Sequence, residues 1–197
     1  MQSNASVKLY DLNSILSLAS NEVRGIYESF YKAFRRPMKE VGLTDIFMLI
    51  TRDKAKAIGK EVALKLMSNE NENGADFSFT IHETPSSSSQ VFFQAKVAKR
   101  KGDNVFCDFL YESKKTNHGV TVLEYQNLLL AGYAKSKKAD AYYIVYDYET
   151  VWWVNAFALA KWFDEGGFKD PSDDQICIEA FNNLARRSFF EAMQDSK

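Results

Sequence analysis

The amino-acid sequence predicts one α/β domain, in which helices flank a β-sheet. Three observations predict this class. First, two segments before residue 51 carry apolar residues at helical spacing. Second, residues 76–98 contain two stretches in which apolar and polar residues alternate, on either side of a serine-rich turn. Third, a helix-like segment then precedes a strand-like one. The 197 residues are enough to bury one core. We therefore expect a single domain over 1–197, with a core at about 38–150, a helical extension at 1–37 and a helical region at 151–197.

Two helices are expected before the sheet. The first begins near Ser20 and ends before Pro37, because the residue preceding a proline is disfavoured in a helix. The second runs from about Met38 to Ile50, and Glu40 and Thr44 share one of its faces because they are four residues apart. The apolar stripe predicted for the second helix consists of Val41, Ile46, Leu49 and Ile50.

The sheet is expected to begin after these helices. Residues 61–67 favour a strand, with a helix as the open alternative, and residues 68–74 have the composition of a turn outside regular structure. Phe77, Phe79 and Ile81 then alternate with Asp76, Ser78 and Thr80, which is typical of a half-buried strand. Pro85 and the serines that follow it predict a hairpin turn, and Val91–Ala98 predicts the returning strand.

Five further segments are expected in the second half of the chain. A short strand or turn is predicted near 106–111, and a helix over 121–134 with Val122, Tyr125, Leu128, Leu129 and Gly132 facing inward. The aromatic and β-branched run at 141–148 predicts a strand. Residues 156–163 form an apolar segment that ends at a glycine pair, and a last helix is expected over about 175–193.

Composition and charge narrow the function classes. The formal net charge is −1, so nucleic acid would have to be bound by a local basic patch rather than by the charge of the whole chain. The two cysteines, Cys107 and Cys177, do not have zinc-site spacing. No apolar run approaches the length of a membrane span, and no basic stretch leads into an apolar one. We expect a cytoplasmic protein with no membrane partner.

The two strands of the predicted hairpin bring polar residues to one face. The two-residue period of a strand puts Gln94 and Lys96 on the same side, and it does the same for Asp76 and Ser78. A hairpin centred near Ser86 sets Asp76 opposite Lys96 and Ser78 opposite Gln94. A carboxylate, a carboxamide and an ammonium group are therefore expected to converge.

These three side-chain types suit metal-assisted cleavage of phosphodiester bonds. Asp76 offers Mg²⁺ a hard oxygen ligand, and the side-chain carbonyl of Gln94 and the backbone carbonyl of Ala95 add further oxygens. Lys96 would orient the attacking water or stabilise charge on the phosphate. Glu40 is the candidate for a further carboxylate, which binds the metal through water or holds a second ion. Asp45, on the same predicted helix, is a rival for that role.

Asp76 followed by Gln94-Ala95-Lys96 resembles the core motif of the PD-(D/E)XK nuclease superfamily, in the QxK form found in Mrr-type restriction endonucleases. The predicted order of elements, α, β, β, β, α, β, is also similar to the core of that superfamily. The chain departs from the pattern in having no proline before Asp76 and a glutamine in place of the usual second carboxylate.

The resemblance implies a restriction-endonuclease-like mixed sheet and hydrolysis of DNA with Mg²⁺ or Mn²⁺, in anti-phage defence or mobile-element biology. It gives metal and catalytic roles to Asp76, Gln94 and Lys96. Glu40 matches the acidic residue on the helix that precedes the sheet in the superfamily core. Gln126 matches a polar residue that faces the site from the following helix. Two alternatives stay open, namely a catalytically degenerate binding or assembly module and an RNA-cleaving toxin.

Basic and aromatic residues are candidates for contacts with nucleic acid or protein. Lys99, Arg100 and Lys101 could form a phosphate-binding rim, together with Lys114, Lys115, Lys135, Lys137 and Lys138, or they could be solvated surface charges. Trp152, Trp153 and Trp162 could stack on bases, although a place in the core or in an interface is favoured. The partner is expected to be DNA, and the aromatic C-terminal region is a candidate interface for a homodimer. His82 and His118 are expected at the surface.

Overall fold

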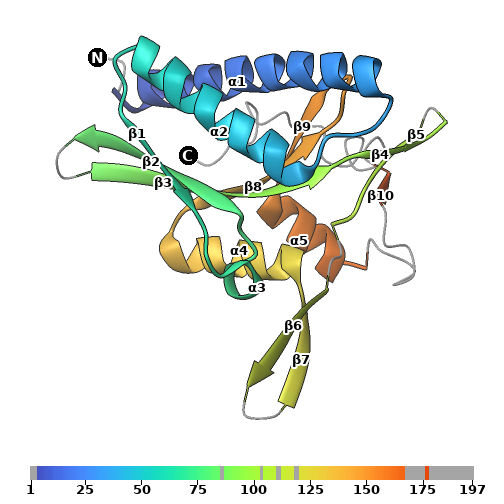
Figure 1. Ribbon diagram of the computed structural model, residues 1–197. Coiled ribbons are helices and arrows are strands. Elements are labelled where there is room, and N and C mark those ends of the chain that lie inside the picture. Colours follow the sequence, from blue (N-terminus) through green and yellow to red (C-terminus); the bar gives the residue numbers. More distant parts are fainter. Residues whose placement is uncertain are drawn as a thin grey trace.

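A five-stranded mixed sheet lies at the centre of the computed structural model, which describes residues 4–84, 87–102, 104–109, 112–117, 120–166 and 176–177 (Figure 1). The strands, in their order across the sheet, are β1 (Val62–Leu66), β2 (Phe77–Thr84), β3 (Ser87–Val97), β8 (Asp140–Tyr146) and β9 (Val151–Asn155). Strands β3 and β8 are parallel, and every other neighbouring pair is antiparallel. The α/β class predicted from the sequence is confirmed.

Helices cover both faces of this sheet (Figure 1). Helices α1 (Asn4–Phe34) and α2 (Glu40–Ala57) pack on one face, and α4 (Gln126–Lys137) and α5 (Ala156–Asp164) pack on the other. Along β3, Val91, Phe93 and Ala95 belong to the core beneath α1 and α2, whereas Phe92 belongs to the core beneath α4 and α5. Because both faces are covered, the polar face of this hairpin is largely shielded from solvent: Ser78 and Gln94 are buried, and Asp76 and Lys96 are partly buried.

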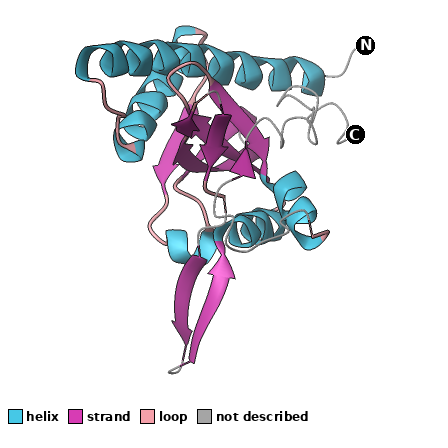
Figure 2. Ribbon diagram, turned by 90° about the vertical axis from the view of Figure 1, so that its right-hand side faces the viewer, coloured by secondary structure: helices cyan, strands magenta, loops and turns pink. Residues whose placement is uncertain are grey.

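Smaller elements surround the sheet. Helix α3 (Glu70–Asn73) is a single turn between β1 and β2. A three-stranded sheet has the order β10 (Ile176–Cys177), β5 (Asn104–Cys107), β4 (Lys99–Lys101). Strands β6 (Glu112–Asn117) and β7 (Val120–Tyr125) form a two-stranded ribbon that projects from the body of the molecule beside α3 and α4 (Figures 1 and 2).

The two N-terminal helices are longer than predicted. The predicted start near Ser20 is wrong, because Ile15, Leu16 and Ala19 already continue the buried face of α1. Helix α2 runs to Ala57 rather than Ile50. Two residues of its predicted apolar stripe, Val41 and Leu49, are exposed, and the face that packs on the sheet carries Leu43, Thr44, Phe47, Ile50 and Thr51.

The segment 121–134 is not one helix. Residues 120–125 form β7, because their β-branched side chains favour an extended backbone and they pair with β6. Helix α4 therefore starts at Gln126, and its buried residues are Gln126, Asn127, Leu130, Ala131 and Ala134 instead of the predicted set.

Other predicted elements differ in smaller ways. Residues 68–74 contain the helical turn α3, and the strand predicted near 106–111 is β5, at Asn104–Cys107. Strand β9 was not predicted. The helix expected from residue 175 is wrong at Ile176–Cys177, which form a strand, and residues 178–193 lie outside the described residues.

The register of the β2–β3 hairpin differs from the prediction by two residues. Phe77 lies opposite Phe93, and Ser78 lies opposite Phe92 instead of Gln94. The pairing shifts between His82 and Thr84, next to the predicted turn residues 85 and 86, which are outside the described residues. A shift of two residues keeps each side chain on its face of the sheet. Asp76 is thereby set level with Gln94 rather than Lys96.

The tryptophans support the core of the domain. The ring of Trp153 lies 5.8 Å from that of Phe47 and 5.7 Å from that of Phe93. Trp152 and Trp162 pack against the core on the opposite face. All three are partly buried against the core, which agrees with the favoured place in the core or in an interface. His82 is exposed, as expected, and His118 is outside the described residues.

Candidate functional site

The carboxylate of Asp76 is held by β3. Its Oδ2 accepts hydrogen bonds from the side-chain Nε2 of Gln94 at 2.8 Å and from the backbone N of Ala95 at 2.7 Å. The backbone of Asp76 is fixed as well, because its N donates to the carbonyl of Phe93 and its carbonyl accepts from Met67 N, both at 2.8 Å. The structure therefore brings Asp76, Gln94 and Ala95 together, as the sequence predicted.

Lys96 joins the same cluster from the next position on this face of β3. Its Nζ donates to Oε1 of Gln126 at 2.8 Å. Gln126 is the first residue of α4 and is 1% exposed, so the start of that helix faces the sheet at the cluster. The placement predicted for Gln126 agrees with this contact.

Glu70 is a member of the cluster that the sequence analysis missed. Its Oε1 accepts hydrogen bonds from Nε2 of Gln126 and, at 3.4 Å, from Nε2 of Gln94. One signal was available in the sequence. Glu70 lies six positions before Asp76 in the connection that leads into β2, so the chain must return it to the same end of the hairpin.

Helix α3 is fixed against α4 by a close approach of the two backbones. Gly74 ends α3 with φ at 67°, a left-handed conformation that favours glycine. A Cβ atom at this position would lie 2.6 Å from the backbone N of Leu130 and 2.7 Å from the carbonyl O of Gln126. Asn73 is buried beside it and accepts a hydrogen bond from Ala75 N at 2.8 Å. The position of Glu70 is thus set by packing.

The amide of Gln94 lies at the centre of the cluster. The side chain is 0% exposed, and its Nε2 also approaches the backbone carbonyl of Ala95 at 3.4 Å, in addition to Asp76 and Glu70. Its Oε1 is buried and has no hydrogen-bond partner among the described residues. An unsatisfied buried carbonyl costs free energy, because it has lost its hydrogen bonds to water. The cluster therefore contains one acceptor without a donor.

Burial changes the acidity of two carboxylates. It raises the pKa of Asp76 to about 6, although the hydrogen bond from Ala95 acts in the opposite direction. Burial also raises the pKa of Glu40 to about 7, where nearby Lys96 lowers it and Asp76 and Glu70 raise it further. These mutual effects show that Glu40 is close enough to the cluster to respond to its charges.

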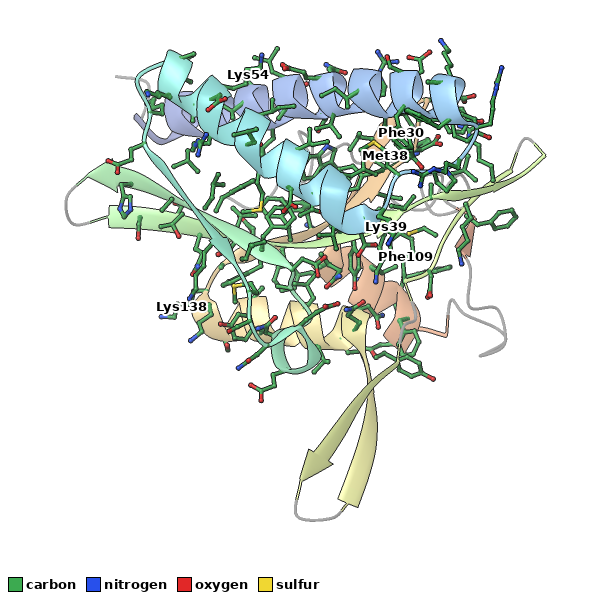
Figure 3. All side chains as sticks on the ribbon, viewed as in Figure 1. Phe30, Met38, Lys39, Lys54, Phe109 and Lys138 are labelled. Atoms are coloured by element: carbon green, nitrogen blue, oxygen red, sulfur yellow. The ribbon has the colours of Figure 1, made fainter. Side chains whose placement is uncertain are left out.

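Glu40 belongs to the other helical layer. It is the first residue of α2, and Lys39, which precedes it, marks the end of α2 that comes down toward the sheet (Figure 3). Asp45, the rival carboxylate on α2, is exposed. Of the two predicted candidates on this helix, Glu40 is the one whose charge is coupled to Asp76 and Lys96.

Arg100, a member of the predicted basic rim, is bound by acidic residues of the fold. The guanidinium of Arg100 donates to both carboxylate oxygens of Asp147, at 3.0 Å from Nε to Oδ1, and it also pairs with Glu149. It lies over the ring of Tyr148, 4.8 Å from the centroid, so it is held within the fold. Lys99 is exposed. The side chains of Lys101, Lys114 and Lys115 are outside the described part of the structure.

The remaining lysines of the predicted rim lie at the far end of α4. Lys135 and Lys137 are in its last turn and Lys138 follows it (Figure 3). The length of this helix separates them from Gln126 by roughly 14–18 Å at the rise of an α-helix. The structure does not bring these three lysines to the cluster.

The donor set can be compared with the needs of a metal ion. Among the described residues, there is no group of three or more His, Cys, Asp or Glu side chains that could by itself hold a metal ion. The cluster offers instead the carboxylates of Asp76 and Glu70, the backbone carbonyl of Ala95 and the unpartnered Oε1 of Gln94. All of these are oxygens, the ligand type that Mg²⁺ and Mn²⁺ prefer, so the residues present fit such an ion.

Comparison with protein families places the chain in one of them. The model of DUF6615, described as a family of unknown function, matches residues 13–182. The chain belongs to DUF6615. The DUF6615 match includes every residue of the cluster, from Glu40 to Gln126. No curated protein matches the chain. No helix in the described residues of this DUF6615 member combines the length and apolarity of a membrane span.

Proposed function

We propose that this protein is a divalent-metal-dependent nuclease of the PD-(D/E)XK type that hydrolyses phosphodiester bonds of DNA. The observation that carries the proposal is the hydrogen-bonded cluster in which Asp76, Gln94 and Lys96 meet on one face of the hairpin. The order α2, β1, β2, β3, α4, β8 supports it, because it agrees with the α, β, β, β, α, β order of the superfamily core.

Each side chain has a role in this reaction. A bound Mg²⁺ or Mn²⁺ would polarise the phosphate and make a bound water more acidic. Asp76, Gln94 Oε1 and the carbonyl of Ala95 would hold the ion. Lys96 would donate to a phosphate oxygen as negative charge develops there. Glu40, with a pKa near 7, would take a proton from the attacking water close to neutral pH.

The surroundings of the site extend the proposal. The exposed Lys99 follows the end of β3 and would contact the phosphate backbone of DNA. The proposal also assigns the protein to the cytoplasm, to anti-phage defence or mobile-element biology, and to a homodimer that cuts two strands. The defence or mobile-element context rests on the resemblance to Mrr-type endonucleases alone.

Cleavage assays test the proposal. Plasmid DNA, linear duplex, single-stranded DNA and RNA are incubated with the purified protein and Mg²⁺, Mn²⁺ or a chelator. We expect cleavage of DNA only with metal, and a loss of at least about 100-fold in rate for Asp76→Asn and Lys96→Met. Asp45→Asn is the matched control, because it removes an exposed carboxylate of α2, and it should cleave at the rate of the unmodified protein.

Two outcomes would contradict the proposal. If all four nucleic acids remain intact with both metals at high protein concentration, a binding or assembly module is favoured instead. If RNA alone is cut, the protein is an RNA-cleaving toxin that uses the same cluster.

A further inference from the structure

We propose that Glu70, on the one-turn helix α3, supplies the negative charge that Gln94 lacks and binds the same divalent cation as Asp76. This inference rests on the proposed function and deepens it by adding a metal ligand that the QxK motif does not contain. It also explains how a site with a neutral glutamine in place of the second carboxylate could hold a hard dication.

The geometry of the Gln94 amide supports this assignment. Its Nε2 donates to Asp76 at 2.8 Å and approaches oxygens of Glu70 and Ala95 at 3.4 Å each. Three oxygens therefore surround one point, which the partly positive NH₂ group now occupies. A cation held between these oxygens, with the amide displaced from that point, would be attracted to two carboxylates and one carbonyl, which form the core of an oxygen-rich site.

The unpartnered Oε1 of Gln94 is an independent observation that points to a ligand. The side chain is 0% exposed, yet this oxygen has no donor among the described residues. Rotation of the amide by 180° exchanges its oxygen and nitrogen. Without a cation, that rotation would direct the oxygen at two carboxylates and would be unfavourable. With a cation between them, the rotated amide satisfies the oxygen as a ligand.

The charges near the cluster also favour a dication. Glu40, Glu70 and Asp76 interact electrostatically with one another and with Lys96. Asp108 acts on Glu40 as well, so when all are ionised the carboxylates outnumber the one ammonium. A divalent cation would offset much of this negative charge, to which Glu70 contributes.

Glu70 is also held in place and accessible. The approach of Gly74 to the backbone of α4 fixes the end of α3, and Gln126 holds the carboxylate through a hydrogen bond. Glu70 is nevertheless exposed as a residue, so an ion can reach the carboxylate from solvent. A mobile turn would have to be ordered at each binding event, whereas this one is positioned before the metal arrives.

The test is calorimetric titration of the full-length protein with MnCl₂ alone, without nucleic acid. Glu70→Gln keeps the shape of the side chain and removes its charge, and it should raise the Kd for Mn²⁺ by about 10-fold or more. Glu72→Gln, on the same turn, makes the same charge change at an exposed residue bonded to Asn69, and its Kd should stay within about 2-fold of the unmodified protein.

A charge-transfer variant separates a ligand from a structural residue. In the double variant Glu70→Gln/Gln94→Glu the carboxylate is moved to the other side of the same point, so Mn²⁺ affinity should return to within about 3-fold of the unmodified protein. Loss of affinity in Glu70→Gln through disturbed packing would not be restored in this way, and that result would overturn the inference. Equal loss in Glu70→Gln and Glu72→Gln would also overturn it, as would unchanged binding in Glu70→Gln.

Failure of this inference can be distinguished from failure of the proposed function. If the unmodified protein binds Mn²⁺ and cleaves DNA, and Glu70→Gln does both equally well, only the role of Glu70 is wrong. If the unmodified protein neither binds Mn²⁺ nor cleaves any nucleic acid, both proposals are wrong.

Discussion

The two faces of the central sheet are built differently. Under α1 and α2, Phe47 packs with ring centroids 6.1 Å from both Phe77 and Phe79, and the buried polar residues of α2 are Thr44 and Thr51. On the other face the corresponding helix, α4, buries two carboxamides, Gln126 and Asn127, beside Gln94 of the sheet. Carboxamides carry more donors and acceptors than hydroxyls, so burying them demands more partners.

This difference separates stability from function. The face under α1 and α2 is filled by interlocking aromatic rings, which define the fold. On the face under α4, part of the aromatic packing is replaced by side chains that can donate or accept hydrogen bonds or ionise. Neither amide atom of Asn127 has a hydrogen-bond partner among the described residues, and the hydroxyl of Tyr143 has none either. Tyr143 lies on β8, opposite Gln94 of β3. The hydroxyls of Thr44 and Thr51 also lack a partner among the described residues, so the two faces differ in their buried amides and carboxylates rather than in unsatisfied atoms alone.

The largest effect on stability should come from the aromatic face. Phe47→Ala removes a fully buried ring and should lower the free energy of unfolding by about 3–5 kcal/mol, measured by urea denaturation without metal. On the other face, Gln126→Met should lower it by about 1–3 kcal/mol, because Lys96 and Glu70 each lose one hydrogen-bond partner. If both variants lower the free energy of unfolding equally, the proposed division into a stabilising face and a functional face is wrong.

The contact between α3 and α4 should give the next largest effect. Gly74→Ala adds a Cβ atom against the backbone of α4 in a left-handed conformation, and it should cost about 2–4 kcal/mol. Gly59→Ala is the matched control, since Gly59 has φ at 69° but nothing within 4 Å of the added atom. It should cost only about 1 kcal/mol. Equal costs would show that α3 is not fixed by this contact.

Arg100 and Lys99 should respond in different experiments. Arg100→Ala leaves the buried carboxylate of Asp147 unpaired and should lower the free energy of unfolding by about 2 kcal/mol. Lys99→Ala should change the free energy of unfolding by no more than about 0.5 kcal/mol. It should also make DNA affinity less dependent on salt concentration, by about the contribution of one phosphate contact. A stable Arg100→Ala protein with weakened DNA binding would instead restore Arg100 to the phosphate-binding rim.

A smaller effect than that of Arg100 concerns Glu40 and pH. Its pKa is about 7 in the folded protein, above its ordinary 4.5, so the folded state binds this proton more tightly than the unfolded state does. That contribution to stability is complete below pH 4.5 and is lost as the pH rises toward 7. Glu40→Gln should therefore be more stable than the unmodified protein by about 1–2 kcal/mol at pH 8 without metal, and nearly equal to it at pH 4. Urea denaturation at both pH values measures this, and a destabilised variant at pH 8 would contradict it.

The sequence predicted the shared face of Asp76, Gln94 and Lys96 because a strand has a period of two. The two-residue error in register therefore left the cluster intact. Burial of Gln94 could not be predicted in the same way, since it depends on helices that come from distant parts of the chain. The start of α4 was missed because residues 120–125 carry an apolar pattern that also fits a helix.

Glu70 was missed for a different reason. Residues in a short connection follow no periodicity, so their sequence does not say which side chain turns inward. The position of Glu70 depends on the contact of Gly74 with Leu130, which joins residues far apart in the chain. Sequence reasoning could indicate that the connection returns to Asp76, and only the packing identifies the carboxylate.

The most direct test of the account is anomalous diffraction from crystals of the protein soaked in MnCl₂. The account predicts one Mn²⁺ peak about 2.0–2.3 Å from a carboxylate oxygen of Asp76, with the Gln94 amide rotated so that Oε1 faces the ion. The peak should be absent in crystals of Asp76→Asn. A peak elsewhere on the surface, or none at saturating MnCl₂, would contradict a metal-dependent active site at this cluster.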